Sequence, residues 1–421
     1  MTAAQLFAYG LLGAPLAAAA LPIYLHIPKL YAEHHGVSLA LLGIVLFAAR
    51  LFDALADPLI GVASDRARSR RILVLAGLLP LAIGLVAMVR PAAGIDPLTW
   101  LLGTLFLVYA GYSITTINYA AWGAELSRTP ALGTRLVASR EAWSLIGVVA
   151  ASVAPGLLSD EAPTGLWRAV LGWLPWLCLA ALLTAVTVPD AIPHAPRQAL
   201  SAALQEVMRH ARFRRLLAVF ALNGIAAAIP GTLVLFFIAD VLQAPEREGL
   251  FLALYFSAGV LALPLWTRLA DRVGRARSWS VSMVIAIAVF GWAWTLGPGD
   301  VLAFALICVG SGIALGADLA LPPALLAGLV SRRDEPLPAG GSFGVWTFVT
   351  KLNLALAAGV ALPALAFFGY RPGEQGEPAR VALTAVYALL PLVLKLGAFL
   401  LLWNGARSIE PGPADDRART A

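Results

Sequence analysis

Apolar runs of roughly 20 residues recur along almost the whole chain, and this feature limits its fold more than any other. A run of that length crosses the hydrocarbon core of a bilayer when it forms a helix. Of the 421 residues, 60% are hydrophobic and only 13% are charged. Charged residues make up about a quarter of a typical soluble domain. The sequence therefore predicts an all-α membrane protein.

The apolar runs are near-continuous, whereas the strands of a membrane β-barrel alternate over segments of ~10 residues. No Lys or Arg precedes Lys29, so the first run lacks the positive start of a signal peptide, and we expect it to remain as a span. Cys178 and Cys308 lie inside apolar runs and are expected to be buried hydrophobes. We predict twelve spans, at residues 5–28, 39–63, 72–90, 98–123, 136–158, 166–188, 214–240, 247–267, 278–296, 300–330, 342–369 and 380–404.

The basic residues are distributed unevenly between the predicted loops. Most of the 30 Lys and Arg residues fall in alternate connections, and the connections between these carry few. The positive-inside rule places the basic loops, and with them both termini, in the cytoplasm. Topology and lipid head groups therefore account for the pI of about 9.6, and no nucleic-acid partner is needed. We expect a monomer in the cell (inner) membrane.

A short pattern occurs twice in the chain, at a constant offset of 206 positions, which is close to half of the length. The matching pairs are Pro58 and Pro264, Asp65 and Asp271, and Arg66 and Arg272. Each copy leaves the second span of a six-span group and enters a cytoplasmic loop. The repeat predicts two pseudo-symmetric halves at 1–188 and 214–404, a linker at 189–213 and a tail at 405–421.

Two such halves are the arrangement of the major facilitator fold, with the substrate site near the bilayer midplane between them. The G-x-x-x-D-R-x-x-x-R pattern that begins at Gly61 resembles the signature loop of that superfamily. We therefore expect a conformational role for Gly61, Asp65 and Arg66, and for Asp271 and Arg272 in the second half.

Several charged residues lie within predicted spans, where each costs at least ~2.5–3.5 kcal/mol unless it faces a cavity or another charge. The second span carries Arg50, Asp53 and Asp57, whose spacings of three, four and seven place them on one helical face. Lys351 and Asp318 lie in the eleventh and tenth spans. From a rise of ~1.5 Å per residue, these acidic residues, Lys351 and the hydroxyl of Thr115 are expected in one layer, roughly 10–18 Å from the cytoplasmic surface.

Arg50 and Lys351 balance the charges of Asp53 and Asp57, so an empty site is nearly neutral. A bound cation or proton would displace Lys351 or Arg50 from a carboxylate, and this competition is a plausible coupling device because it changes which helices are bridged. The alternative is a permanent network of buried ion pairs that pins the second span to the eleventh.

The segment from Arg50 to Gly61 closely resembles the R-x-x-D-x-x-x-D-P-x-x-G signature of the glycoside–pentoside–hexuronide:cation symporters, the melibiose carrier family. Asn118 to Ser127 and Arg140 resemble further parts of that family, as does the segment that ends at Lys351. The resemblance implies that Asp53 and Asp57 ligate the coupling cation, with Thr115 as a hydroxyl ligand and Lys351 as the exchanging countercharge.

Three positions depart from the carrier's pattern. Ala56 replaces an amide, which thins the oxygen shell for Na⁺ and makes coupling to H⁺ (or Li⁺) more credible. Ala17 and Asn118 replace the two carboxylates with which the carrier grips sugar hydroxyls. A galactoside grip is therefore not expected.

The remaining candidates for substrate binding are polar or aromatic residues near the predicted layer. Asn118 and Trp122 share a helical face that suits hydrogen bonding and ring stacking, although Trp122 equally suits packing. Arg140 could meet an anionic substrate or snorkel to head groups. Asp318 could hold a second proton or pair with Lys351.

The sequence has no nucleophile elbow, phosphate loop or HExxH pattern, so an enzyme is not expected, and neither is a cofactor other than the coupling ion, H⁺ or Na⁺. The leading hypothesis is a symporter of a sugar or glycoside that works by alternating access. The alternatives are symport of a lysolipid or organic acid, and a non-transporting scaffold or sensor that retains the fold.

Overall fold

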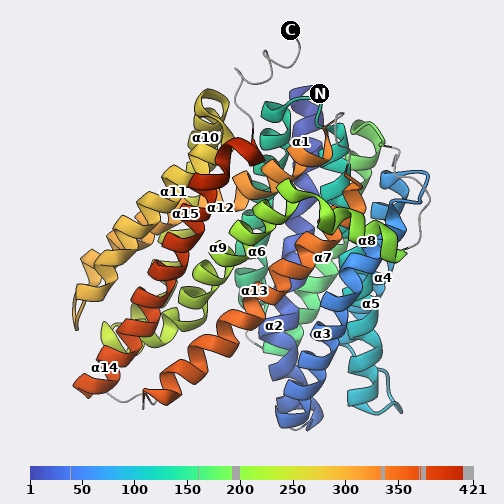
Figure 1. Ribbon diagram of the computed structural model, residues 1–421. Coiled ribbons are helices and arrows are strands. Elements are labelled where there is room, and N and C mark those ends of the chain that lie inside the picture. Colours follow the sequence, from blue (N-terminus) through green and yellow to red (C-terminus); the bar gives the residue numbers. More distant parts are fainter. Residues whose placement is uncertain are drawn as a thin grey trace. The chain divides into compact units, whose positions relative to one another are not determined.

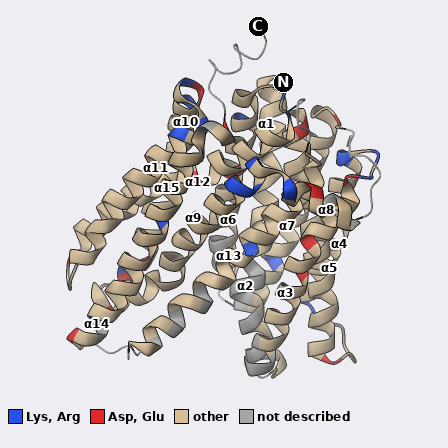
Figure 2. Ribbon diagram, viewed as in Figure 1, with Lys and Arg blue, Asp and Glu red and all other residues tan. Residues whose placement is uncertain are grey.

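The structure is a computed structural model that describes residues 1–37, 39–159, 161–191, 200–332, 337–368, 370 and 376–410. Its regular elements are helices, drawn in Figure 1. In the described part of the chain, nine helical segments are long and apolar enough to cross a membrane. Figure 2 shows that most of the ribbon of the long helices carries neither acidic nor basic residues. The few charges inside them are therefore exceptional.

The chain divides into two compact units. Unit 1 comprises Met1–Val207 and Val330–Phe348, and unit 2 comprises Met208–Leu329 and Val349–Ala421. The first helices are α1 (Ala3–Leu11), α2 (Gly13–His35), α3 (Leu39–Ser64), α4 (Arg70–Val89), α5 (Pro97–Leu126), α6 (Pro130–Leu158), α7 (Ala162–Thr187) and α8 (Leu200–Arg209). They are followed by α9 (Ala211–Phe236), η1 (Phe237–Val241), η2 (Pro245–Arg247), α10 (Glu248–Val273), α11 (Arg275–Gly291), η3 (Trp292–Thr295), α12 (Val301–Val330), α13 (Ala339–Phe367), α14 (Glu377–Thr384), η4 (Ala385–Leu389) and α15 (Leu390–Ile409).

Local sequence signals set several helix starts. Asp96 and Thr129 cap α5 and α6, each through its side-chain oxygen, and a proline follows each cap at the first helical position. That order is favourable because the cap satisfies a free backbone N–H, while proline has none to satisfy. Ser69 also caps α4 through its side-chain oxygen, but it is followed by Arg70 and not by a proline.

The same device anchors one helix start in each unit to an acidic residue that follows a later helix. In unit 1, Asp190 lies just after α7 and accepts hydrogen bonds from the Ser69 hydroxyl and the Arg71 backbone N–H at the start of α4. In unit 2, Glu410 lies just after α15 and accepts the backbone N–H of Ala276 at the start of α11, at 2.8 Å. A carboxylate near a helix N-terminus is favoured by the helix dipole.

Glycines allow α4 and α5 to pack with their backbones in close contact, and these two helices lie side by side in Figure 1. A Cβ atom at Gly111 would lie 2.5 Å from the backbone nitrogen of Leu81 and 2.6 Å from the carbonyl oxygen of Gly77. Small residues at such crossings are a general feature of membrane helix packing. This crossing holds α5 in register, and α5 carries several of the site residues described below.

We expect Gly111→Ala to lower the stability of the protein by about 1–3 kcal/mol, because the new methyl group has no room between α4 and α5. The matched control is Gly103→Ala in the same helix, where a Cβ atom would meet nothing within 4 Å. The control should be neutral or slightly stabilising, since alanine is a better helix former. Apparent melting temperatures in detergent measure both. Equal melting temperatures for the two variants would contradict the close crossing.

Candidate functional site

The two acidic residues in the middle of α3 are turned into the protein. Asp57 is completely buried and Asp53 is 7% exposed, whereas Phe52, Leu55 and Leu59 on the outer face of the same helix are at least half exposed. Asp53 accepts a hydrogen bond from the Ser113 hydroxyl of α5, with 2.8 Å between the oxygens. The buried face of α3 is therefore the polar one, which is the arrangement expected for carboxylates in a membrane helix.

The hydroxyl at Asp53 belongs to Ser113 and not to Thr115, the residue singled out from the sequence. Thr115 is also fully buried, but its hydroxyl points to α4 and donates to the carbonyl oxygen of Val74 at 3.3 Å. Ser113 and Thr115 are two positions apart on α5, so they lie on different faces of the helix. Helical periodicity could have shown from the sequence that only one of these two hydroxyls faces α3, and it could have favoured Ser113 over Thr115.

Arg50 on α3 and Lys351 on α13 are both half-buried. Arg50 belongs to unit 1, and Lys351 lies just beyond the point at which α13 passes from unit 1 into unit 2. The exchange of partners between these cations and the carboxylates of α3 stays a prediction.

Arg70, at the start of α4, is the centre of a buried polar network. Its side chain is completely buried, and it donates to Glu125 through Nε and one terminal nitrogen, in a two-pronged contact of 2.8–3.2 Å. It also donates to Asp65 at 2.5 Å, to Ser64 at 3.1 Å and to Asn118 at 3.0 Å. A guanidinium group has five N–H donors, and these contacts occupy all five.

Asp65 connects this network to the start of α13. Its two carboxylate oxygens accept the backbone N–H groups of Gly340 and Gly341, both at 2.7 Å. These N–H groups lie in the first turn of α13, which has no helical partners for them and where the helix dipole favours a negative charge. Asp65 therefore clamps the N-terminus of α13 to the end of α3.

Glycines make this clamp possible. A Cβ atom at Gly340 would lie 2.2 Å from the carbonyl oxygen of Gly61, and one at Gly344 would lie 2.6 Å from the carbonyl oxygen of Asp57. The backbone of α13 thus runs directly against α3, beside Asp57, which the family resemblance predicts to be a cation ligand.

The repeated loop motif has different surroundings in the two units. In the first copy Asp65 is buried, but Arg66 is exposed, and the arginine that Asp65 binds is Arg70 at the end of the pattern. In the second copy Asp271 and Arg272 are both exposed. The two copies of the motif therefore differ in burial, because Asp65 is covered and Asp271 is exposed.

The buried arginine of unit 2 is Arg275. It binds Glu410 at 2.7 Å and donates to the carbonyl oxygen of Ala324 in α12, also at 2.7 Å. Glu410, Glu125 and Arg275 were not singled out from the sequence, because their partners are distant along the chain.

Asn118 and Trp122, predicted to contact substrate, both make contacts within unit 1. The amide oxygen of Asn118 accepts from Arg70 and its nitrogen donates to the carbonyl oxygen of Ile114. The indole N–H of Trp122 donates to the carbonyl oxygen of Pro189 at 2.9 Å, and its side chain is 1% exposed. In this structure both side chains are part of the packing around Arg70 and the end of α7.

Arg140 on α6 pairs with its neighbour Glu141 through two hydrogen bonds, the shorter being 2.7 Å. Its guanidinium carbon lies 5.9 Å from the ring centre of Tyr119, which packs against Tyr9. The acidic partner next to Arg140 in the sequence makes a net positive site for an anionic substrate less favourable than the sequence analysis supposed.

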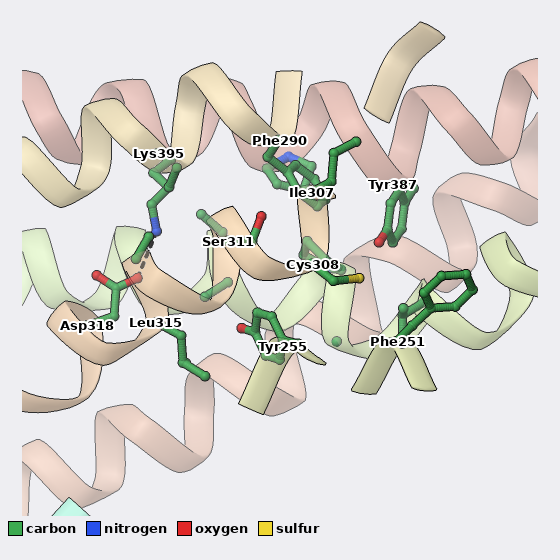
Figure 3. Close-up of a pocket in the computed structure, with 18 of the residues that line it drawn as sticks. Phe251, Tyr255, Phe290, Ile307, Cys308, Ser311, Leu315, Asp318, Tyr387 and Lys395 are labelled. Carbon is green, nitrogen blue, oxygen red and sulfur yellow. Dashed lines mark hydrogen bonds and ion pairs between the residues drawn. The ribbon is translucent and has the colours of Figure 1, made fainter. Parts of the chain in front are cut away.

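Asp318 on α12 pairs with Lys395 on α15, at 2.8 Å between nitrogen and oxygen (Figure 3). The indole N–H of Trp279 on α11 donates to the other carboxylate oxygen, also at 2.8 Å. From the sequence, Asp318 was expected either to hold a second proton or to pair with Lys351. The partner in the structure is the cation of the last span, and the pair borders a cavity.

A family described as MFS/sugar transport protein matches residues 6–404. The chain belongs to this family of major facilitator transporters. This result, together with relatives named as glycoside/cation symporter and glucuronide carrier, confirms the predicted relation to the glycoside–pentoside–hexuronide:cation symporters.

Individual relatives agree over most of their length. The chain is 24% identical over 411 residues to the glucuronide carrier protein homolog of Escherichia coli (strain K12), covering 89% of this chain and 86% of that protein. It is 22% identical over 400 residues to the inner membrane symporter YicJ of the same organism, covering 89% and 85%. The crystal structure of the E. coli fucose:proton symporter FucP matches with a TM-score of 0.69 at 14% identity, covering 94% of this chain and 97% of that one.

These matches establish an all-helical major facilitator fold and a multi-pass membrane transporter, not an enzyme. The geometry of this family member includes two features of immediate interest. The carboxylates of Asp53 and Asp57 are buried within a transporter, and the arginine network around Arg70 fixes the start of α13 beside them.

We expect Arg70→Met to destabilise this transporter by about 3–5 kcal/mol, because it leaves the buried carboxylates of Asp65 and Glu125 without their countercharge. Arg68→Met is the matched control, since Arg68 is exposed in the same loop and its replacement should change stability by less than about 0.5 kcal/mol. Thermal unfolding in detergent gives the comparison. If both variants melt together, the Arg70 network is not a structural node.

Proposed function

We propose that the protein is a cation-coupled secondary symporter of a small polar solute, most favourably a sugar or glycoside, that works by alternating access. The observation that supports this proposal most is the pair of buried carboxylates on α3, in a chain whose relatives bear the names of symporters. Charged groups at such a depth are expensive to bury, so a pair of them on one face argues for a bound cation.

The proposed cation ligands are Asp53, Asp57 and the hydroxyl of Ser113. Carboxylate and hydroxyl oxygens are hard ligands that suit Na⁺, and carboxylates also accept H⁺. Thr115 remains a candidate only if its hydroxyl leaves the carbonyl oxygen of Val74 in another conformation. Because Ala56 offers no side-chain oxygen next to Asp57, few protein ligands are at hand, which favours H⁺ over Na⁺.

A sugar as the transported solute is supported by the names of the relatives, a glucuronide carrier homolog and a fucose:proton symporter. The second candidate is an organic acid or a lysolipid. It is favoured by Ala17 and Asn118, since Ala17 has no polar group for a sugar hydroxyl and Asn118 already binds Arg70. Membership in a family of transporters argues against the scaffold or sensor hypothesis.

The proposed topology is twelve spans in two halves. The protein lies in the inner membrane, with both termini in the cytoplasm. This topology is supported by the distribution of basic residues and by the length of the described helices. In this topology the clamp of Asp65 on the first turn of α13 lies at the cytoplasmic end of α3. We propose that this clamp must break when the site opens to the cytoplasm.

Asp57→Asn tests the coupling role. It should abolish solute accumulation driven by an imposed Na⁺ or H⁺ gradient in proteoliposomes, because a neutral amide neither carries the proton nor balances a cation. The solutes offered are L-fucose, a methyl glucuronide, a methyl glycoside and a monocarboxylate. Accumulation that Asp57→Asn leaves unchanged would contradict the role of this residue, and equilibration without any gradient would contradict coupling altogether.

The control for this test is Asp96→Asn. Asp96 is the exposed cap of α5, a hydrogen bond from the backbone N–H of Thr99 lowers its pKa, and asparagine caps a helix equally well. The control thus removes one negative charge from the protein without touching the buried face of α3. It should transport like the unmodified protein.

A second pair of variants identifies the hydroxyl ligand. With Na⁺ as the coupling ion, Ser113→Ala should raise the Na⁺ concentration that gives half-maximal transport by roughly tenfold, because a hydroxyl ligand is lost. With H⁺ as the coupling ion, the same variant should lower the H⁺ concentration required, because the hydroxyl donates a hydrogen bond that stabilises the Asp53 carboxylate against protonation. Thr115→Val removes a hydroxyl of α5 that faces α4 and bonds to a backbone carbonyl oxygen there. Because that bond joins neutral groups, the variant should change the half-maximal cation concentration by less than about threefold. The reverse order would restore Thr115 as the ligand.

A further inference from the structure

Unit 2 contains a cavity of about 220 Å³ whose lining residues all belong to that unit. Its walls come from α9, α10, α11, α12, η4 and α15, all of which belong to unit 2 over the residues concerned. Figure 3 shows the labelled side chains gathered around this space. The sequence suggested a coupling role for one of its lining residues, Asp318, but the proposed cation ligands lie elsewhere, on α3 and α5.

Aromatic rings, together with aliphatic side chains, form the wall away from the charged end. Phe251 and Phe304 meet edge to face with ring centres 4.8 Å apart, and Phe290 and Tyr387 lie 5.2 Å apart. Tyr255 completes this group. Such a wall takes the apolar face of a ring or a short hydrocarbon group.

The opposite end is polar. It is formed by the Asp318–Lys395 pair, which Trp279 supports from α11, and by Ser311, which lies about two turns before Asp318 on the same face of α12. Ser311 Oγ is buried and has no hydrogen-bond partner among the residues that the structure describes. A buried hydroxyl without a partner costs free energy, so a group that binds it would be stabilised there.

The pair has hydrogen-bonding capacity left over. Lys395 carries three N–H donors, one of which Asp318 accepts. The two oxygens of Asp318 accept from Lys395 and Trp279 and retain further lone pairs. A ligand hydroxyl would therefore find both a donor and an acceptor at this end, beside the hydroxyl of Ser311.

The charge of the site argues for an uncharged ligand. Asp318 and Lys395 neutralise each other at 2.8 Å, so a carboxylate or an ammonium group would bring an unbalanced charge into an apolar cavity. Burying such a charge is costly. A neutral hydroxyl avoids that cost.

Size and polarity limit the ligand further. A cavity of about 150 Å³ lined by apolar side chains holds benzene, so 220 Å³ accommodates one ring with a short substituent. A free hexose has hydroxyls all round its ring, whereas the hydroxyls of Tyr255 and Tyr387 are the polar groups of the aromatic wall, so most of the sugar hydroxyls would face apolar surface. A ring with a hydroxyl at one end fits both walls.

We propose that this cavity is a second ligand site, which binds an uncharged, ring-sized alcohol or phenol with its hydroxyl between Ser311 and the Asp318–Lys395 pair. All of the residues that line this site belong to unit 2, so the proposal does not rest on a cation at the carboxylates of α3.

The test is ¹⁹F NMR of 4-fluorobenzyl alcohol titrated onto the full-length protein in lipid nanodiscs, with empty nanodiscs subtracted. Saturable binding is expected, with an affinity higher than for 4-fluorotoluene, which lacks the hydroxyl, and for 4-fluorobenzoate and 4-fluorobenzylamine, which carry a charge. No saturable binding of the alcohol, or tighter binding of either charged probe, would overturn the proposal.

Ser311→Ala places the ligand. It should weaken binding of 4-fluorobenzyl alcohol by about 2- to 10-fold, the value of one hydrogen bond, and leave that of 4-fluorotoluene unchanged or stronger. Ser280→Ala is the matched control, because Ser280 is a buried serine of α11 outside the cavity whose hydroxyl bonds to the carbonyl oxygen of Ala276. Equal effects of the two variants would place the alcohol elsewhere.

Charge variants test the neutrality argument independently. In Asp318→Asn the site becomes positive, so 4-fluorobenzoate should bind at least tenfold more tightly than it does to the unmodified protein. In Lys395→Met the site becomes negative, so 4-fluorobenzylamine should gain in the same way. If neither probe gains in a folded variant, the pair does not select the charge of the ligand, and the proposal fails on that point. The Ser311→Ala result still decides the location if these variants do not fold.

Discussion

The cost of placing charge in hydrocarbon governs this structure. Asp53, Asp57, Arg70 and Lys395 all lie on helices with long apolar surfaces, and each is buried in the protein instead of facing outward. The apolar face of α3 is exposed while its carboxylates are covered, the inverse of a helix in a soluble protein. Every proposal about function starts from that inversion.

The buried charges differ in how completely they are satisfied. All five donors of Arg70 are occupied, and one of its acceptors, Asp65, also binds the first turn of α13. A group with no capacity left holds one arrangement and resists partial change. The Asp318–Lys395 pair keeps donors and lone pairs beside an open cavity, so it has the capacity to bind something more. This difference separates a structural clamp from a candidate binding site.

Features that depend on local sequence were predicted correctly more often than contacts between residues far apart in the chain. Helix positions, the membrane class and the family resemblance rest on local composition and on a contiguous motif from Arg50 to Gly61, and the comparisons confirm the family. Partners proved harder. Ser113 instead of Thr115 meets Asp53, and Lys395 instead of Lys351 meets Asp318. In each case the chain offers two residues of the same chemistry as possible partners. Which of them makes the contact depends on the rotation and packing of its helix.

The sequence by itself determined that the chain is a helical membrane transporter, because apolar runs of spanning length and a contiguous signature need no knowledge of tertiary contacts. It also located acidic residues on one face of α3, since helical periodicity is local. Only the tertiary structure decided that Asn118 and Trp122 bind Arg70 and Pro189, and that α13 starts on Asp65. Such contacts depend on how closely glycine-lined backbones approach, and that distance is set by the packing of segments far apart in the chain.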